Sequence, residues 1–227
     1  MLSAVIFDFD GIIVDTEPLH YRSFQTILEP LGLGYSWDEY VSRYMGFDDR
    51  DAFAEAFHAA GRTLSPAELD SLIQRKAQVF QQVISGGVVP YPGVTELIRG
   101  LAGSLPLALC SGALLSDITP ILSQFSLENA FDVIVTADDV AASKPDPASY
   151  ALAVTRLQSR FPAQEIVPAH CLAIEDTPAG IASAQGAGIP VLAVTNSYPA
   201  PDLHAADRVV ASLEGLDRDR LAKLLTP

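Results

Sequence analysis

Basic residues are scarce in this chain of 227 residues. Lysine and arginine together number 14, against 28 aspartates and glutamates, so the formal net charge at pH 7 is −14. Nucleic acids and acidic membrane surfaces gain nothing by counterion release from so acidic a protein. We therefore expect neither nucleic acid nor a membrane among its partners.

Long hydrophobic runs are absent as well. No apolar stretch reaches the roughly 18 residues that are needed to span a bilayer. The first residues lead directly into the apolar run AVIF, without the basic segment and small-residue cleavage site of a signal peptide. From these two features we expect a cytoplasmic protein, and we take a monomer as the default state.

Cysteine is equally rare. Cys110 and Cys171 each lie in an apolar, strand-like run, and neither belongs to a cluster with metal-ligand spacing. Two buried, reduced thiols are the expected state in the cytoplasm. A disulfide between them is the alternative that the sequence leaves open.

The sequence does contain enough apolar residues, 49% of the total, for a sizeable core. Short apolar runs recur between helical stretches, at residues 4–10, 106–111, 132–137, 170–176 and 190–196. Their continuous rather than alternating apolarity indicates parallel strands that are covered by helices on both faces. We therefore predict an α/β fold with a Rossmann-like, doubly wound parallel sheet.

Residues 16–88 break this alternation and have the pattern of helices only. Spacing of i, i+3, i+4 and i+7 predicts one apolar helical stripe, formed by Phe24, Ile27, Leu28 and Leu31. We predict a small all-helical cap domain at 16–88, inserted into an α/β core domain formed by 1–15 and 89–227. Two connections between the domains could act as the hinge of a lid.

Asp8 and Asp10 end the first apolar run, just before Gly11. Side chains at i and i+2 share a face of a strand, so both carboxylates can point into one cleft if the extended geometry persists. Such a pair suits Mg²⁺, which takes one or two protein carboxylates together with phosphate oxygens. A capped turn is the ordinary alternative. The second acidic doublet at a predicted strand end, Glu175 with Asp176, favours a metal site.

Further polar residues are predicted at the same edge of the sheet. Lys144 lies in ASKPDP, where two prolines restrict the backbone, and its ammonium suits a phosphate dianion; an ordinary surface lysine is the alternative. Ser111, followed by Gly112, ends a predicted strand before a helix and can hold phosphate oxygens, with a plain N-cap as the compatible alternative. Asp176 is the natural third oxygen ligand of the metal. Glu175 would support the metal through water or orient Lys144.

Four segments, DFDGIIVDTE, CSGA, SKPDP and IEDTPAGI, resemble the four ordered motifs of the haloacid dehalogenase superfamily, in the branch with a helical cap after the first motif. The likeness extends over nearly the whole chain and is closest to the phosphatases and β-phosphoglucomutases. It implies that Asp8 is the nucleophile that forms an aspartyl-phosphate, and that Asp10 protonates the leaving oxygen and later activates water. It also implies Mg²⁺ on Asp8, on the main-chain carbonyl of Asp10 and on Asp176, with Lys144 neutralising the transferring group.

The predicted cap holds four candidate substrate residues. Lys76 lies on an otherwise apolar helical stripe; either it snorkels past the edge of the core, or it points to a substrate phosphate, as the resemblance to β-phosphoglucomutase-like caps implies. Gly46 and Arg50 resemble the cap segment that contacts sugar phosphates. Their spacing is one residue longer than in β-phosphoglucomutase, and the following DAF departs from its serine-rich continuation. His20 also matches mutase-like relatives, with a half-exposed helix residue as the alternative.

From these features we expect a Mg²⁺-dependent phosphatase that acts on a small phosphorylated metabolite, with a sugar phosphate as the favoured class. A β-phosphoglucomutase-type phosphosugar mutase is the alternative with the same covalent chemistry. A non-enzymatic phospho-acceptor module, which also joins a strand-end aspartate to Mg²⁺ and lysine, is a third hypothesis. Asp10 and the inserted lid argue against it.

Overall fold

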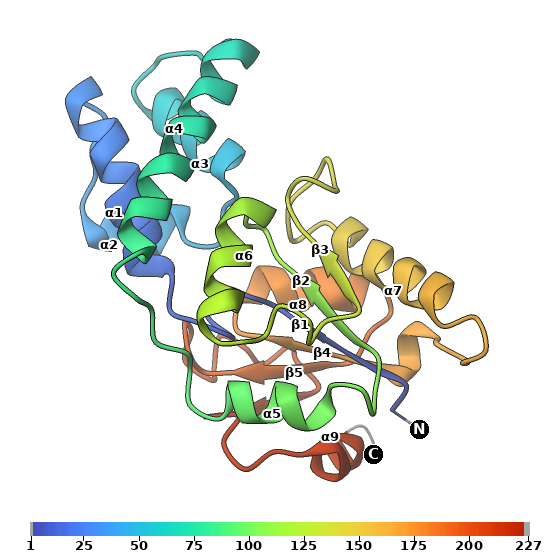
Figure 1. Cartoon of the computed structure of the whole chain (residues 1–227). Coiled ribbons are helices and arrows are strands. Elements are labelled where there is room, and N and C mark those ends of the chain that lie inside the picture. Colours follow the sequence, from blue (N-terminus) through green and yellow to red (C-terminus); the bar gives the residue numbers. More distant parts are fainter. Residues whose placement is uncertain (1, 225–227) are drawn as a thin grey trace. The chain divides into compact units, whose positions relative to one another are not determined.

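The computed structural model describes residues 2–224 of the chain. The chain divides into two compact units, one formed by Met1–Asp15 with Val89–Pro227 and the other by Thr16–Val88. We name them the core unit and the helical unit. The core unit is built around a sheet, whereas the described residues of the helical unit form helices and turns (Figure 1).

Among the described residues, six strands form one parallel sheet in the order β3-β2-β1-β4-β5-β6. The strands are β1 (Ala4–Phe7), β2 (Leu107–Cys110), β3 (Val133–Val135), β4 (Cys171–Glu175), β5 (Val191–Val194) and β6 (Arg208–Val210). The prediction of a Rossmann-like α/β fold is confirmed. The apolar runs contain all strands except β6, which has three residues, none of them fully buried.

Helices cover both faces of this sheet. α5 (Val94–Leu101) and α6 (Leu115–Gln124) precede β2 and β3, on one side of β1. α7 (Ala148–Arg160) and α8 (Pro178–Gly186) precede β4 and β5, on the other side. Because parallel crossovers are right-handed, the two pairs of helices lie on opposite faces (Figure 1). The short turn η3 (Pro168–His170) precedes β4, and α9 (Arg218–Leu224) follows β6.

The central strand β1 is buried on both faces. Ile6 packs in a cluster with Tyr150 of α7 and Ile181 of α8, while Val5 and Phe7, whose side chains point to the opposite face, are also fully buried. Burying an aliphatic or aromatic side chain of this size contributes about 1.5–3 kcal/mol. This two-sided burial is the physical reason for the continuous apolar runs in the sequence.

The chain leaves the core unit after Asp15 and re-enters it at Val89. Val14 forms an antiparallel bridge with Pro90, and the N–H of Tyr91 donates to the carbonyl of Ile13 at 3.0 Å. The outgoing and returning segments therefore lie side by side within the core unit.

The helical unit has its own apolar core. Its elements are α1 (Glu17–Leu28), η1 (Glu29–Leu31), α2 (Trp37–Glu39), η2 (Tyr40–Tyr44), α3 (Asp49–Ala59) and α4 (Pro66–Ile84). Phe24 and Leu28 are buried in this core, where the rings of Phe24 and Phe53 form a T-shaped pair. The predicted place of Leu31 in the stripe is wrong: α1 ends at Leu28, and Leu31 is 38% exposed.

Both cysteines are buried and are not bonded to each other. Burial raises the pKa of Cys110 to about 12 and that of Cys171 to about 11, so neither thiol is reactive at neutral pH. Within residues 2–224, no helix combines the length and the hydropathy that a membrane crossing requires.

Candidate active site

Polar side chains meet at the carboxyl ends of the central strands of the core unit. Asp8 follows β1, Ser111 follows β2, and Glu175 ends β4 with Asp176 next to it. β1 lies between β2 and β4, at the point where the strand order reverses. Open α/β sheets bind their ligands at this switch point.

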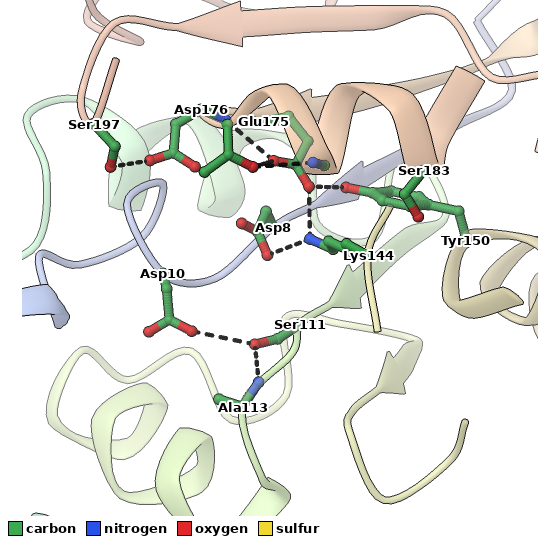
Figure 2. A network of polar contacts seen from close by, with 12 residues as sticks. Asp8, Asp10, Ser111, Ala113, Lys144, Tyr150, Glu175, Asp176, Ser183 and Ser197 are labelled. Atoms are coloured by element: carbon green, nitrogen blue, oxygen red, sulfur yellow. Dashed lines mark hydrogen bonds and ion pairs between the residues drawn. The ribbon is translucent and has the colours of Figure 1, made fainter. Parts of the chain in front are cut away.

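Lys144 bridges two of these carboxylates. Its Nζ lies 2.8 Å from Asp8 Oδ1 and 2.6 Å from Glu175 Oε1 (Figure 2). The Lys144 side chain is only 11% exposed, so the alternative of an ordinary surface lysine is wrong. The loop between β3 and α7 brings Lys144 to Asp8 at the end of β1, 136 residues away in sequence.

Both carboxylate oxygens of Glu175 accept hydrogen bonds. Besides Lys144, Oε1 accepts from the Tyr150 hydroxyl at 2.7 Å, and Oε2 accepts from the backbone N–H of Asp176 at 3.2 Å. A Cβ at Gly180 would lie 2.0 Å from this carboxylate, so glycine is required where α8 begins. These contacts favour the prediction that Glu175 orients Lys144 over support of a metal through water.

The loop after β5 holds Asp176 and the turn after Asp10. The Ser197 hydroxyl donates to Asp176 Oδ2, and the side-chain amide of Asn196 donates to the carbonyl of Gly11 at 2.6 Å. Gly11 has φ of +76°, and a Cβ there would lie 1.8 Å from Asp176 Oδ2. Sequence reasoning missed Asn196 and Ser197, although Asn196 ends the apolar run at 190–196 and Ser197 follows it, which was a usable signal.

Asp10 faces the end of β2. Ser111 Oγ donates to Asp10 Oδ2 at 3.4 Å and accepts from the N–H of Ala113 at 2.9 Å (Figure 2). The N-cap of α6 is Leu114, so the plain N-cap alternative for Ser111 is wrong. Gly112 lies in the same turn and is exposed. β1 ends at Phe7, so neither Asp8 nor Asp10 lies within the strand. Both nevertheless belong to the same group of polar side chains (Figure 2).

Charge is unevenly distributed in this group. Burial, and then the charge of Glu175, raises the pKa of Asp8 to about 8, although Lys144 opposes the shift. Burial by itself would lower the pKa of Lys144, but Asp8 and Glu175 outweigh it and raise that pKa well above its usual value. Lys144 is therefore positively charged at neutral pH, whereas ionisation of Asp8 requires additional positive charge nearby.

The carboxylates of this group fit a divalent cation. Asp8, Glu175 and Asp176 are all buried, and each offers one oxygen within 4.8 Å of the other two. Three ionised carboxylates and one ammonium leave two negative charges uncompensated, which is costly in a buried site. Carboxylate oxygens are the hard ligands that Mg²⁺ prefers. The residues present are therefore suited to Mg²⁺.

Lys76 and His20 of the helical unit are both buried and contact each other. Lys76 is 1% exposed, and its Nζ lies 2.8 Å from both Asp49 Oδ1 and His20 Nδ1. It also lies 4.9 Å from the ring centroid of Phe80, on which the His20 ring stacks. The snorkelling alternative for Lys76 is wrong, and so is the half-exposed alternative for His20, which is 9% exposed.

Gly46 and Arg50 flank the start of α3 in the helical unit. Gly46 has φ of +85°, a left-handed conformation that favours glycine. Arg50 donates from Nη2 to Asp48 Oδ2 at 3.1 Å, and Asp48 Oδ1 accepts from the N–H of Asp51 at 2.9 Å as the N-cap of α3. The capping aspartate therefore also holds the arginine.

Comparison with known proteins gives consistent matches over most of the chain. Residues 5–194 match the model of the haloacid dehalogenase-like hydrolase family. Protein CbbY from Rhodobacter capsulatus is 31% identical over 98% of this chain and 99% of its own length. The phosphorylated carbohydrates phosphatase of Thermotoga maritima is 30% identical over 83% of this chain and 82% of its own length. The β-phosphoglucomutase of Bacillus subtilis is 29% identical over 97% of this chain and 94% of its own length.

Solved structures are similar as well. CbbY from Rhodobacter sphaeroides in complex with phosphate has a TM-score of 0.86 and 25% identity, covering 98% of this chain and 100% of that chain. A variant of the same protein in complex with xylulose-(1,5)bisphosphate has a TM-score of 0.85 and 25% identity, covering 97% of this chain and 99% of that chain.

Proposed function

Because the chain belongs to the haloacid dehalogenase-like hydrolase family, we propose that it is a Mg²⁺-dependent phosphatase that hydrolyses a small sugar phosphate through an aspartyl-phosphate on Asp8. One observation carries the proposal: the buried Asp8 carboxylate is paired with Lys144 at 2.8 Å and lies among other carboxylates that fit a divalent cation. The phosphatase among the relatives supports the reaction class.

In the first step, a carboxylate oxygen of Asp8 attacks phosphorus, and the bond from phosphorus to the leaving oxygen breaks. Asp10 transfers its proton to that oxygen, so the alcohol leaves in neutral form. Lys144 neutralises part of the charge on the phosphoryl oxygens, and Ser111 and the backbone N–H of Gly112 bind them.

In the second step, water attacks phosphorus while Asp10 accepts a proton from it. The bond from phosphorus to the Asp8 oxygen breaks, which releases phosphate and restores the carboxylate. Mg²⁺, when bound, supplies the additional positive charge that phosphoryl transfer demands. Asp8, the main-chain carbonyl of Asp10 and Asp176 would hold it, and Glu175 keeps Lys144 in position.

We also propose that the helical unit is the cap domain of this enzyme. Its two connections to the core unit begin beside the bridge between Val14 and Pro90, so both can move together as a hinge. His20, Gly46, Arg50 and Lys76 are the residues of this unit that we propose for selecting the leaving group.

Turnover of a panel of phosphorylated metabolites tests this proposal. We expect repeated release of phosphate from one or more sugar phosphates with Mg²⁺, and loss of that release when EDTA removes the cation. Absence of turnover on the whole panel, together with a long-lived phosphorylated protein, would instead identify a phospho-acceptor module.

A phosphosugar mutase is the second candidate, favoured by the 29% identity to a β-phosphoglucomutase over nearly the full length of both chains. A mutase returns the phosphoryl group to a sugar hydroxyl before water reacts with it. β-Glucose 1-phosphate with a trace of the 1,6-bisphosphate separates the two activities. Glucose 6-phosphate formed without free phosphate would establish the mutase and exclude the phosphatase.

A further inference from the structure

Cations are scarce around the proposed phosphoryl site. The segments between each strand end and the next helix, strand or unit boundary are residues 8–15, 111–114, 136–147, 176–177, 195–207 and 211–217. Within these described segments, Lys144 is the only lysine or arginine. Phosphate groups are bound in proteins chiefly by arginine, lysine and backbone N–H groups. The core unit therefore offers one strong cationic side chain for phosphate at this edge of the sheet.

Lys144 is already committed to the reacting group. It lies 2.8 Å from Asp8, the proposed nucleophile, and 2.6 Å from Glu175, and its side chain is 11% exposed. A lysine enclosed in this way can neutralise a phosphoryl group beside Asp8. It has no freedom to reach a second phosphate at the far end of a substrate.

The chain beside Asp10 is apolar and acidic. Ser111 donates to Asp10 and accepts from the N–H of Ala113, whose carbonyl accepts from the N–H of Ala137 at 3.1 Å. Leu115, the first residue of α6, follows Ala113 by two residues, a span of at most about 7 Å. Leu115 is 46% exposed, and its N–H donates to Asp138 Oδ2 at 3.2 Å. A substrate group here meets a leucine side chain and a carboxylate, and a phosphate dianion is repelled by the latter.

The candidate phosphate-binding cations of the helical unit are paired with carboxylates of that same unit. Lys76 lies 2.8 Å from Asp49, and Arg50 lies 3.1 Å from Asp48. A second phosphate on either cation would compete with an aspartate. This pairing weakens the attraction of both side chains for an additional dianion, because no metal is proposed to compensate Asp48 or Asp49, as Mg²⁺ is for the carboxylates beside Lys144.

We propose that the substrate is a monophosphate whose remaining groups are uncharged, and that Leu115 and Asp138 disfavour a second phosphate on the same molecule. This inference rests on the proposed phosphatase function and specifies its substrate class. It separates the chain from the solved relative whose complex contains xylulose-(1,5)bisphosphate. It also assigns a specificity role to the segment between β2 and α6.

Matched pairs of substrates test the inference. The value of kcat/KM is measured for fructose 1-phosphate against fructose 1,6-bisphosphate, and for glucose 6-phosphate against glucose 1,6-bisphosphate. In each pair that is turned over, we expect at least about a tenfold preference for the monophosphate, because juxtaposed like charges are unfavourable. The preference should narrow as added salt screens the charges.

Equal or faster turnover of the bisphosphates would overturn the inference and leave the phosphatase proposal intact. Absence of turnover on every monophosphate and bisphosphate would refute both. The two failures are therefore distinct.

Variants of one position give the second arm of the test. Leu115→Lys should raise the ratio of bisphosphate to monophosphate kcat/KM by about fivefold or more, because it adds a cation beside the leaving group. Leu115→Met is the matched control, with similar volume and no charge, and should leave the ratio within about twofold. An unchanged ratio in a folded Leu115→Lys protein, verified by circular dichroism, would contradict the assignment of Leu115.

Discussion

Each unit of the molecule buries one lysine beside carboxylates, and the two clusters differ in their charge balance. In the core unit, Lys144 contacts both Asp8 and Glu175 within 2.8 Å. In the helical unit, the partners of Lys76 include the carboxylate of Asp49 and the ring nitrogen of His20, both also at 2.8 Å. The first cluster has an excess of negative charge that raises the pKa of Asp8, whereas the second sets the Lys76 ammonium against the Asp49 carboxylate and the His20 ring.

This difference separates a cluster that requires additional positive charge from one in which the lysine already faces a carboxylate. A buried pair of equal and opposite charges is satisfied by its own geometry and hydrogen bonds. A buried excess of negative charge lowers its free energy by taking up a proton or a cation, and the raised pKa of Asp8 is the sign of that demand. The core cluster is therefore the one suited to bind Mg²⁺ and phosphate.

The largest expected effect is that of Asp8→Asn on turnover. Replacing the proposed nucleophile with an uncharged side chain of the same shape should lower kcat by more than about a thousandfold. Asp70→Asn makes the same chemical change at an exposed position of α4 and should keep full activity. Steady-state phosphate release measures both. Residual activity of Asp8→Asn within tenfold of the unmodified protein would refute the nucleophile assignment.

The next effect comes from removing each buried lysine. Lys144→Met should lower kcat by about a hundredfold or more, because it removes charge stabilisation from the transferring group. Lys76→Met should lower the free energy of unfolding by about 3 kcal/mol, since it leaves Asp49 without its cation, and should raise KM more than it lowers kcat. Equal losses of kcat in the two variants would remove the distinction between the clusters.

The stability of metal-free protein should depend on pH through Asp8. Its pKa is raised from 3.8 to about 8, so the folded protein retains a proton that the unfolded chain has lost. The free energy of unfolding in EDTA should therefore fall as pH rises from about 5 to about 8. Urea denaturation at several pH values measures the slope. Mg²⁺ and Asp8→Asn should each flatten it, and a slope that neither changes would show that another group is responsible.

The smallest effect is expected from Ser197→Ala. The Ser197 hydroxyl donates to Asp176, so its loss should weaken Mg²⁺ binding by about tenfold, the lower end of the range for residues that orient metal ligands. Titration calorimetry with Mg²⁺ measures the affinity. Ser159→Ala, at an exposed position of α7, is the control and should bind Mg²⁺ normally. Identical affinities in the two variants would exclude a role of Ser197 in holding the ligand.

Much of the fold could be predicted from the sequence because buried parallel strands leave continuous apolar runs. β6 could not, since its residues at the sheet edge, which include Arg208, carry no such run. The meeting of Asp8, Ser111 and Asp176 was predictable for a related reason: the carboxyl ends of parallel strands share one edge of the sheet.

Partners that depend on tertiary packing could not be predicted. Tyr150 lies in a helix, and nothing in its local sequence indicates that its hydroxyl reaches Glu175. The partner of Lys76 was equally unpredictable, because its counter-charge, Asp49, lies on another helix. The apolar stripe around Lys76 suggested only snorkelling or ligand binding. Periodicity places a side chain on a face but does not identify what it contacts there.

Trapping the covalent intermediate tests the central proposal most directly. A sugar phosphate that is turned over in Mg²⁺ is mixed rapidly with the enzyme, and the reaction is quenched and treated with borohydride, which reduces an aspartyl-phosphate to homoserine. Peptide mass spectrometry then identifies the modified residue. The proposed mechanism predicts homoserine in place of Asp8 and none in Asp8→Asn. Homoserine at another aspartate, or none during continued turnover, would contradict it.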